Sequence, residues 1–226
     1  MIAGGAEASI TPSTVAGFTA ARALSRQNED PKRASRPFDR DRDGFVLGDG
    51  AGVIILEELE HAKQRKAKIY AELVGYGMSA DAFHMTLPSD TGEGAHKCMK
   101  NAINNAEIKT NEINYINAHG TSTPAGDVVE IEAIKKLFGK EMPYISSTKS
   151  LTGHSLGAAG VHEAIYSLLM LKENFLAGSA NIDNLDEKIK DAPILLENKE
   201  LDVNRVLSNS FGFGGTNACL IFETYA

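Results

Sequence analysis

The stretch SSTKSLTGHSLGAAG, residues 146–160, decides how the chain folds and what kind of site it could hold. From Leu156 onward it passes into an apolar segment rich in small residues that extends to residue 173, which predicts a buried helix. Its centre, residues 153–157, has the G-x-S-x-G spacing of the nucleophile turn in serine hydrolases. Either Ser155 is a nucleophile, or the polar residues around it form a different site.

Helical and strand patterns alternate on both sides of this stretch. The segments with helical periodicity are 14–25, 95–106, 127–139 and 156–173. The segments with strand patterns are 44–60, 69–79, 113–120, 143–148 and 205–224, the last forming two strands around a glycine turn. Asp127 is expected to cap its helix and Gly139 to end it. The alternation predicts an α/β fold in which helices cover both faces of a sheet.

The composition is that of an ordinary globular protein: 226 residues, 42% of them hydrophobic, with a net charge of −7. A negative chain has no overall attraction for nucleic acid or for an anionic membrane, so neither is an expected partner. No run of about 18 apolar residues is present that could span a membrane. The two cysteines, Cys98 and Cys219, lie far apart without metal-ligand spacing, which predicts a reducing, cytoplasmic location.

One acidic pattern resembles a metal site without completing it. Asp39, Asp41, Asp43 and Gly44 match the first positions of a calcium-binding EF-hand loop. The twelfth position of such a loop needs a glutamate, and this chain has Gly50 there. We therefore expect a charged turn and no metal ion.

The serine-hydrolase pattern fails in its order. An α/β-hydrolase needs an acid and then a histidine after the nucleophile. The only histidine after Ser155 is His162, and no acid lies between the two. Ser155 is better interpreted as an early residue of the following helix, and a serine hydrolase remains a disfavoured alternative.

Two histidines in matching contexts form a better candidate site. His154 lies five residues after Lys149, and His119 lies in an earlier loop; each follows a short predicted strand and precedes a predicted helix. Neutral imidazole N–H groups could stabilise negative charge on a carbonyl oxygen. Glu163 falls on the buried helix, where a carboxylate needs a partner, and Lys149 is the natural one.

Four long stretches resemble a known family. They are SRPFDRDRDGFVLGDGAG (35–52), NAHGTSTPAGD (117–127), SSTKSLTGHSLGAAG (146–160) and NSFGFGGTNA (209–218). These are similar to signatures of the β-ketoacyl-[acyl-carrier-protein] synthases, in particular the type II, chain-elongating branch. The resemblance implies a thiolase-like fold of two similar α/β halves in layered αβαβα order. Residues 81–226 would form the complete C-terminal half, and residues 1–80 the remainder of the N-terminal half.

The resemblance also implies a reaction and roles for individual residues. The reaction is a decarboxylative Claisen condensation of fatty acid biosynthesis, which joins an acyl thioester to malonyl on acyl carrier protein without a cofactor. His119 and His154 would bind the malonyl thioester oxygen, beside the active-site Lys149 and its structural partner Glu163. Phe213 would gate the site, and its backbone N–H would contribute to the oxyanion hole.

Further contacts implied by the resemblance concern the carrier. Thr121 and Thr123 match residues that contact the pantetheine arm, and Arg22 falls where the family contacts the carrier protein. The full-length family forms homodimers, so a homodimer is the implied assembly.

The chain departs from the family in its nucleophile. The family uses a cysteine in the N-terminal half, and this sequence lacks that segment. Cys98 lies in an amphipathic segment and Cys219 in an apolar strand, so both are interpreted as packing residues. We therefore expect a split or truncated synthase that cannot condense by itself and whose first strand exposes apolar surface. The alternative is a non-condensing partner subunit, like the chain-length-determining partners of polyketide synthases.

Overall fold

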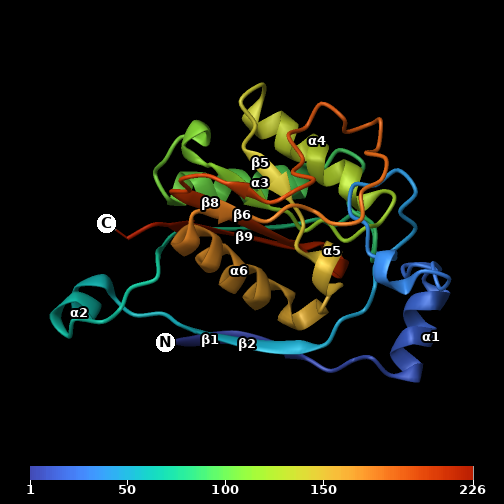
Figure 1. Ribbon diagram of the computed structural model, residues 1–226, viewed down its shortest axis with the longest axis horizontal. Helices are drawn as coiled ribbons and strands as arrows, with labels where there is room; N and C mark the ends of the chain where they lie inside the picture. Colours follow the sequence, from blue (N-terminus) through green and yellow to red (C-terminus); the bar gives the residue numbers. More distant parts are fainter. Residues whose placement is uncertain (226) are drawn as a thin grey trace.

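A computed structural model describes residues 1–225, and its strands form three sheets (Figure 1). The largest has five strands in the order β3-β9-β8-β4-β5. Its strands are β3 (Glu72–Ala80), β9 (Thr216–Glu223), β8 (Arg205–Phe211), β4 (Tyr115–Asn117) and β5 (Tyr144–Ser146). The sheet is mixed, because β3, β9 and β8 pair antiparallel whereas β8, β4 and β5 pair parallel.

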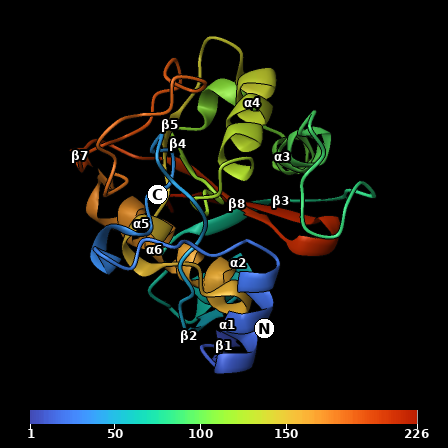
Figure 2. The same ribbon diagram turned by 90° about the vertical axis from the view of Figure 1, so that its right-hand side faces the viewer.

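Helices cover both faces of this sheet, as the sequence predicts. Helices α3 (Glu93–Asn105) and α4 (Gly126–Phe138) lie on one face, and α6 (Ala159–Glu173) lies on the other (Figure 2). Successive strand residues alternate between the two cores, since strand side chains point to opposite faces. Ile116 packs with the α3 and α4 side, and Tyr115 packs with the α6 side.

A two-stranded ribbon forms a further layer beneath α6 (Figure 1). It pairs β1 (Ile2–Glu7) antiparallel with β2 (Gly50–Ile55). Glycines on its inner face allow close packing: a Cβ on Gly52 would lie 2.9 Å from a Val161 side-chain carbon in α6, and a Cβ on Gly5 would lie 2.3 Å from the Gly157 carbonyl oxygen in the turn just before α6. The order of layers is thus helices, sheet, helix and ribbon.

The remaining elements are short and connect these layers. The helices are α1 (Pro12–Ala20), α2 (Leu59–Gln64) and α5 (Lys149–Thr152), and the last strand pair is β6 (Phe175–Leu176) with β7 (Lys199–Glu200). Short 3₁₀ turns span Pro31–Arg33, Thr110–Glu112, Leu156–Ala158 and Phe213–Gly215. Across residues 1–225, no helix has both the length and the apolar character needed to cross a bilayer.

Two local predictions were wrong. Asp127 does not cap α4, which has Ala125 at its cap position; the Asp127 carboxylate instead accepts backbone N–H groups from two other segments. The predicted strand 44–60 shortens to β2, because residues 45–47 pair with loops elsewhere in the molecule. The glycine that ends α4, Gly139, has a φ of 64° and was placed correctly.

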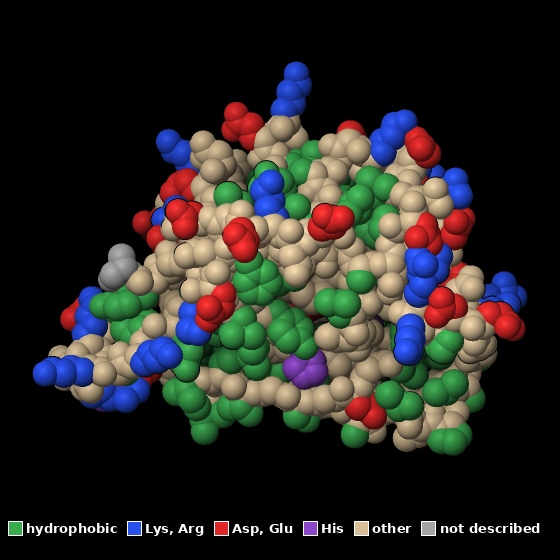
Figure 3. Space-filling model, in the orientation of Figure 1, with side chains coloured by type: hydrophobic (Ala, Val, Ile, Leu, Met, Phe, Trp, Pro, Cys, Tyr) green, Lys and Arg blue, Asp and Glu red, His purple; other side chains and the backbone are tan. Residues whose placement is uncertain are grey.

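The outer face of the ribbon is apolar and open. Ile2, Val53 and Ile55 are 75%, 62% and 66% exposed, and Figure 3 shows hydrophobic side chains along this edge. Exposed apolar side chains on the first strand were expected.

Strand β3, although within the first eighty residues, pairs with β9 in the five-stranded sheet. The division of the chain at residue 80 remains a prediction.

Candidate active site

Three loops meet at one edge of the five-stranded sheet. They follow β4, β5 and β8, which run parallel to one another, so their carboxyl ends lie at the same edge. The loop after β4 carries His119, the loop after β5 carries Lys149 and His154, and the turn after β8 carries Phe213. The topology therefore brings together residues that are up to 94 positions apart, from His119 to Phe213.

The two histidines face each other. Their ring centroids are 5.3 Å apart and their planes are almost perpendicular, at 88°. The His154 backbone N–H donates to the Val46 carbonyl at 2.7 Å, and the Gly48 N–H donates to the His154 carbonyl at 3.0 Å. The segment before β2 thus holds the His154 loop in place.

Burial keeps both imidazoles neutral. It lowers the pKa of His154 to about 3, and the nearby Lys149 ammonium adds to this effect. Burial also lowers the pKa of His119 well below its usual range, with contributions from Lys149 and His154. Within residues 1–225 neither Nδ1 atom has a hydrogen-bond partner. Two neutral rings can therefore donate N–H groups to a ligand without adding positive charge.

Lys149 and Glu163 form a buried ion pair, which is the contact expected from the sequence. Each residue is 2% exposed. Burial raises the pKa of Glu163 to about 7, while the Lys149 ammonium opposes that rise. The Lys149 ammonium lies close enough to both histidines to help lower their pKa values.

Sequence reasoning missed a second buried carboxylate, Glu130. Its two oxygens accept the backbone N–H groups of His119 and Gly120, each at 2.8 Å, and the Asn209 side chain donates to it at 3.0 Å. Glu130 is 4% exposed and lies on the apolar face of α4. A charged residue on the apolar face of an amphipathic helix was the available signal.

Aromatic side chains that were not predicted surround the histidines. Phe211 lies 5.9 Å from His119, and Phe45 lies 5.4 Å from His154, between ring centroids. Phe18 contacts both Phe45, at 5.3 Å, and Phe213, at 6.3 Å. These rings form a chain of contacts from Phe213 through Phe18 and Phe45 to the two histidines and on to Phe211, and both histidines are half-buried.

The other predicted residues are Thr121 and Thr123 in the loop after β4, Phe213 in the turn after β8, and Arg22 after α1. The hydroxyl oxygens of Thr121 and Thr123 are 3.2 Å apart. The Phe213 side chain is 51% exposed and is followed by two glycines with φ of 79° and 82°. Phe213 lines a shallow, open depression of about 290 Å³ together with Thr14, Gly17, Phe18, Ala21 and Thr86. Arg22 follows α1 at the surface and forms no ion pair within the described residues.

The alternative nucleophiles are buried. Ser155 is 4% exposed, although its hydroxyl lies 2.9 Å from His162 Nδ1. Cys98 and Cys219 are fully buried, and burial raises the pKa of the Cys219 thiol well above its usual value. A buried thiol with a raised pKa is a packing residue and a poor nucleophile.

The carboxylates of the acidic turn accept hydrogen bonds from other parts of the protein. Asp39 accepts hydrogen bonds from the backbone N–H groups of Asp183 and Asn184, and Asp43 accepts hydrogen bonds from the Ser25 hydroxyl and the Arg26 backbone N–H. Among residues 1–225, no three histidine, cysteine or carboxylate side chains are grouped so that they could hold a metal ion.

Comparisons with known proteins agree with this geometry. The family model described as "Beta-ketoacyl synthase, C-terminal domain" matches residues 70–183, and the corresponding N-terminal domain model matches residues 1–62. The chain is 52% identical to the 3-oxoacyl-[acyl-carrier-protein] synthase 2 of Vibrio harveyi, over 100% of this chain and 55% of that protein. It is 56% identical to synthase 1 of Haemophilus influenzae, over 100% and 54%.

Solved structures give the same result. A β-ketoacyl synthase from Burkholderia phymatum superposes with a TM-score of 0.95 at 43% identity, covering 100% of this chain and 55% of the other. A ketosynthase solved in complex with its type II polyketide acyl-carrier protein superposes with a TM-score of 0.96 at 36% identity, covering 100% and 56%. The fold is thiolase-like, and the chain spans about half the length of the curated relatives it matches. The chain belongs to the β-ketoacyl synthase family.

Proposed function

We propose that this chain supplies the malonyl-binding, enolate-stabilising part of a 3-oxoacyl-[acyl-carrier-protein] synthase of fatty acid biosynthesis. The observation that carries the proposal is the pair of neutral imidazoles, His119 and His154, next to the buried Lys149. The names of the relatives support it, since they are 3-oxoacyl-[acyl-carrier-protein] synthases 1 and 2.

The chemistry follows from the charge state of the rings. When a malonyl thioester loses carbon dioxide, the electron pair of the broken C–C bond moves into an enolate, whose oxygen carries the negative charge. The N–H groups of His119 and His154 stabilise that oxygen without transferring a proton. The enolate carbon then attacks an acyl thioester, forms the new C–C bond and releases a cysteine thiolate. That cysteine is neither Cys98 nor Cys219, because both are fully buried.

The proposed partner is an acyl carrier protein. A solved relative of this chain is a ketosynthase in complex with its acyl-carrier protein. Thr121 and Thr123 would bind the pantetheine arm, Phe213 would gate its entry, and Arg22 would contact the carrier surface. A homodimer in the cytoplasm is part of the same proposal, and the two unpaired cysteines support its reducing location.

A non-condensing partner subunit is the second candidate. The observation that favours it is the absence of an exposed cysteine among the described residues. The complete histidine pair and its lysine favour the condensing role, because a subunit without chemistry has no need of a charge-stabilising site.

Release of carbon dioxide from malonyl-carrier protein, measured with the purified chain, tests the proposal. We expect His119→Ala and His154→Ala to lower the rate by about 100-fold or more, as loss of an oxyanion donor does. Ser155→Ala should leave the rate unchanged. No release by the parent chain, or loss on Ser155→Ala with tolerance of Lys149→Ala, would contradict the proposal; the second result would favour a hydrolase.

A further inference from the structure

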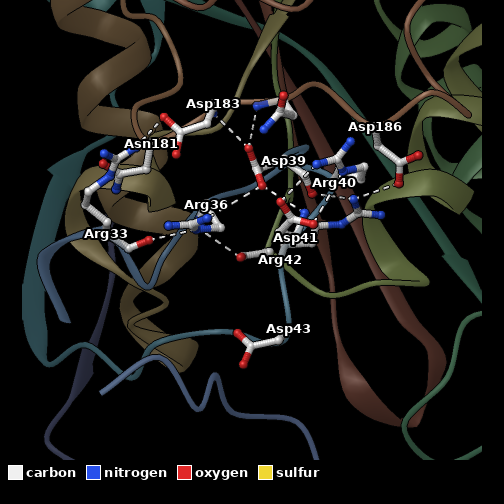
Figure 4. A network of polar contacts seen from close by, with 12 residues as sticks. Arg33, Arg36, Asp39, Arg40, Asp41, Arg42, Asp43, Asn181, Asp183 and Asp186 are labelled. Atoms are coloured by element: carbon white, nitrogen blue, oxygen red, sulfur yellow. Dashed lines mark hydrogen bonds and ion pairs between the residues drawn. The ribbon is translucent and has the colours of Figure 1, made fainter. Parts of the chain in front are cut away.

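Arg42 is the most heavily bonded side chain outside the histidine site. It lies in the DRDRDG turn, and its side chain is 2% exposed (Figure 4). Its guanidinium donates to carbonyl oxygens of Thr123 at 3.0 Å, Pro124 at 2.7 Å and Asp39 at 2.7 Å. It also meets two carboxylates, Asp186 at 2.8 Å and Asp127 at 3.3 Å. Two of its three carbonyl acceptors belong to the loop that follows His119.

Asp127 holds the same loop from its other side. Its carboxylate accepts the backbone N–H groups of Ser122 at 3.1 Å, Thr123 at 3.3 Å and Phe38 at 2.9 Å. Burial raises the pKa of Asp127 to about 6, and Arg42 opposes this rise. Arg42 therefore keeps the carboxylate ionised, so that it can accept all three N–H groups.

The conformation held in this way is strained. Ser122 has a φ of 71°, a backbone conformation that residues other than glycine rarely adopt. Its hydroxyl accepts the Arg36 N–H at 3.1 Å, and its carbonyl accepts the Gly44 N–H at 3.0 Å. Residues 36–44 thus form hydrogen bonds to both sides of the turn at residues 119–124. Such a conformation persists only where the surrounding contacts enforce it.

The turn carries groups that are proposed above to bind the substrate. His119 begins it, and the hydroxyls of Thr121 and Thr123 lie within it, 3.2 Å apart. The same 35–44 region also reaches the other histidine loop, because the Ser35 hydroxyl donates to the Lys149 carbonyl at 2.6 Å. One segment therefore sets the position of both loops.

We propose that Arg42 is a positioning residue that sets the 119–124 turn to receive the pantetheine arm of a carrier-bound thioester. The proposal rests on the proposed function only in naming pantetheine as the ligand. An arginine is needed because its planar fork can donate in several directions at once, whereas a lysine ammonium at this position could reach only part of the acceptor set.

The test compares Arg42→Lys and Arg42→Gln with the parent 226-residue chain. We expect amide hydrogen exchange at Gly44, Ser122 and Thr123 to become about tenfold faster or more, while the amides of β4 and β5 keep their rates. Arg40→Gln is the matched surface control, because Arg40 meets only the exposed Asp41. Arg205→Gln is the control for loss of a half-buried ion pair remote from the turn.

A binding measurement separates positioning from general stability. The probes are malonyl-pantetheine and the shorter malonyl-N-acetylcysteamine, each with the thioester sulfur replaced by NH, titrated by calorimetry. Arg42→Lys should weaken binding of the pantetheine probe by about tenfold and leave the shorter probe nearly unaffected. In a Thr123→Val background, Arg42→Lys should weaken binding of the pantetheine probe no further.

Unchanged exchange at Ser122 and Thr123 in both Arg42 variants would overturn the proposal, as would equal losses of affinity for both probes. If the parent chain binds neither probe, the proposed function is what fails. Faster exchange in Arg42→Lys would in that case still support Arg42 as the residue that sets the turn.

Discussion

The chemistry of single residues in this site depends on burial more than on charge. His119 and His154 are held neutral by their surroundings, although Lys149 and Glu163 form an ion pair close by. A protonated imidazole would stabilise an enolate too, but it would transfer its proton and quench the carbanion. Neutral N–H donors avoid that outcome.

The protonation state of His154 gives a direct prediction. Because its pKa is lowered to about 3, its ring carbon NMR shifts should not titrate between pH 8 and pH 5, and those of His119 should not either. An unperturbed histidine titrates near pH 6.5 and provides the reference. A titration midpoint between pH 5 and pH 7 for either ring would contradict the neutral-donor mechanism.

The Lys149–Glu163 pair predicts a pH-dependent loss of stability. Lys149→Ala leaves a carboxyl buried without a partner and should cost about 3–5 kcal/mol where that carboxyl must be charged. The Glu163 pKa is already raised to about 7 in the parent, above its unfolded value, and losing Lys149 raises it further. Stability of the variant is therefore highest below the unfolded pKa and falls as pH rises through the folded pKa.

Urea unfolding at pH 5 and pH 8 measures this effect. The loss in free energy of unfolding of Lys149→Ala relative to the parent should be larger at pH 8 than at pH 5. The matched control is Lys149→Ala with Glu163→Gln, in which the buried group cannot ionise, so its deficit should be nearly the same at both values. An equal deficit for the single variant at both pH values would mean that Glu163 is not what the lysine stabilises.

Residue pairs near in sequence were easier to predict than distant ones. The contact of Lys149 with Glu163 follows from spacing on one loop and its helix, and a buried carboxylate requires a partner. The place of Glu130 on the apolar face of α4 marked it as unusual, but its donors could not be predicted because they are mostly backbone groups, and the same holds for the acceptors of Arg42. The Pro124 carbonyl is 82 positions from Arg42, and no side-chain pattern marks it.

At the scale of elements, close approach between backbones sets the architecture. The sequence correctly predicted where the main helices and strands occur and which of the two each segment forms, because the spacing of their apolar residues is strongly periodic. The exceptions lie where another segment competes for the same backbone groups. Asp127 is not the cap residue of α4 and instead accepts the Phe38 backbone N–H, and residues 45–47 pair with loops instead of extending β2.

The packing of the ribbon against the start of α6 predicts a contrast between two glycines. A Cβ on Gly5 would lie 2.3 Å from the Gly157 carbonyl oxygen, so backbone must shift, and Gly5→Ala should cost about 1–3 kcal/mol. A Cβ on Gly17, within α1, meets nothing within 4 Å. Gly17→Ala should therefore raise stability, by up to about 1 kcal/mol.

Urea unfolding of the two variants checks the contrast. Since Gly157 lies three residues after His154, Gly5→Ala should also shift the His154 ring resonances, whereas Gly17→Ala gives no reason for such a shift beyond local changes around α1. Equal stability for both variants would mean that the ribbon is not closely packed on the turn that precedes α6.

At the scale of the whole molecule, the chain has both the candidate histidine site and an open apolar face. The outer face of the β1–β2 ribbon presents Ile2, Val53 and Ile55 to solvent. Contiguous exposed apolar side chains of this kind mark a contact surface. The chain also spans about half the length of its curated relatives.

These features together predict how acyl groups behave with this chain. Cys98 and Cys219 are fully buried, and the raised pKa of Cys219 keeps its thiol protonated at neutral pH. Incubation with acyl-carrier protein should therefore add no acyl mass to the chain by intact mass spectrometry. Addition of a cysteine-bearing N-terminal half from a synthase should yield a 3-oxoacyl product when malonyl-carrier protein is present.

The double variant Cys98→Ala/Cys219→Ala is the control for this experiment. If it folds as the parent does, it should give the same product in the mixture, because neither thiol takes part. An acyl adduct on either cysteine of the parent chain would show that the nucleophile is present after all. Product formation by the parent alone, lost in the double variant, would lead to the same conclusion. Product that requires the added half, and that disappears on His154→Ala, would instead place the acyl-bearing thiol and the enolate site on different chains.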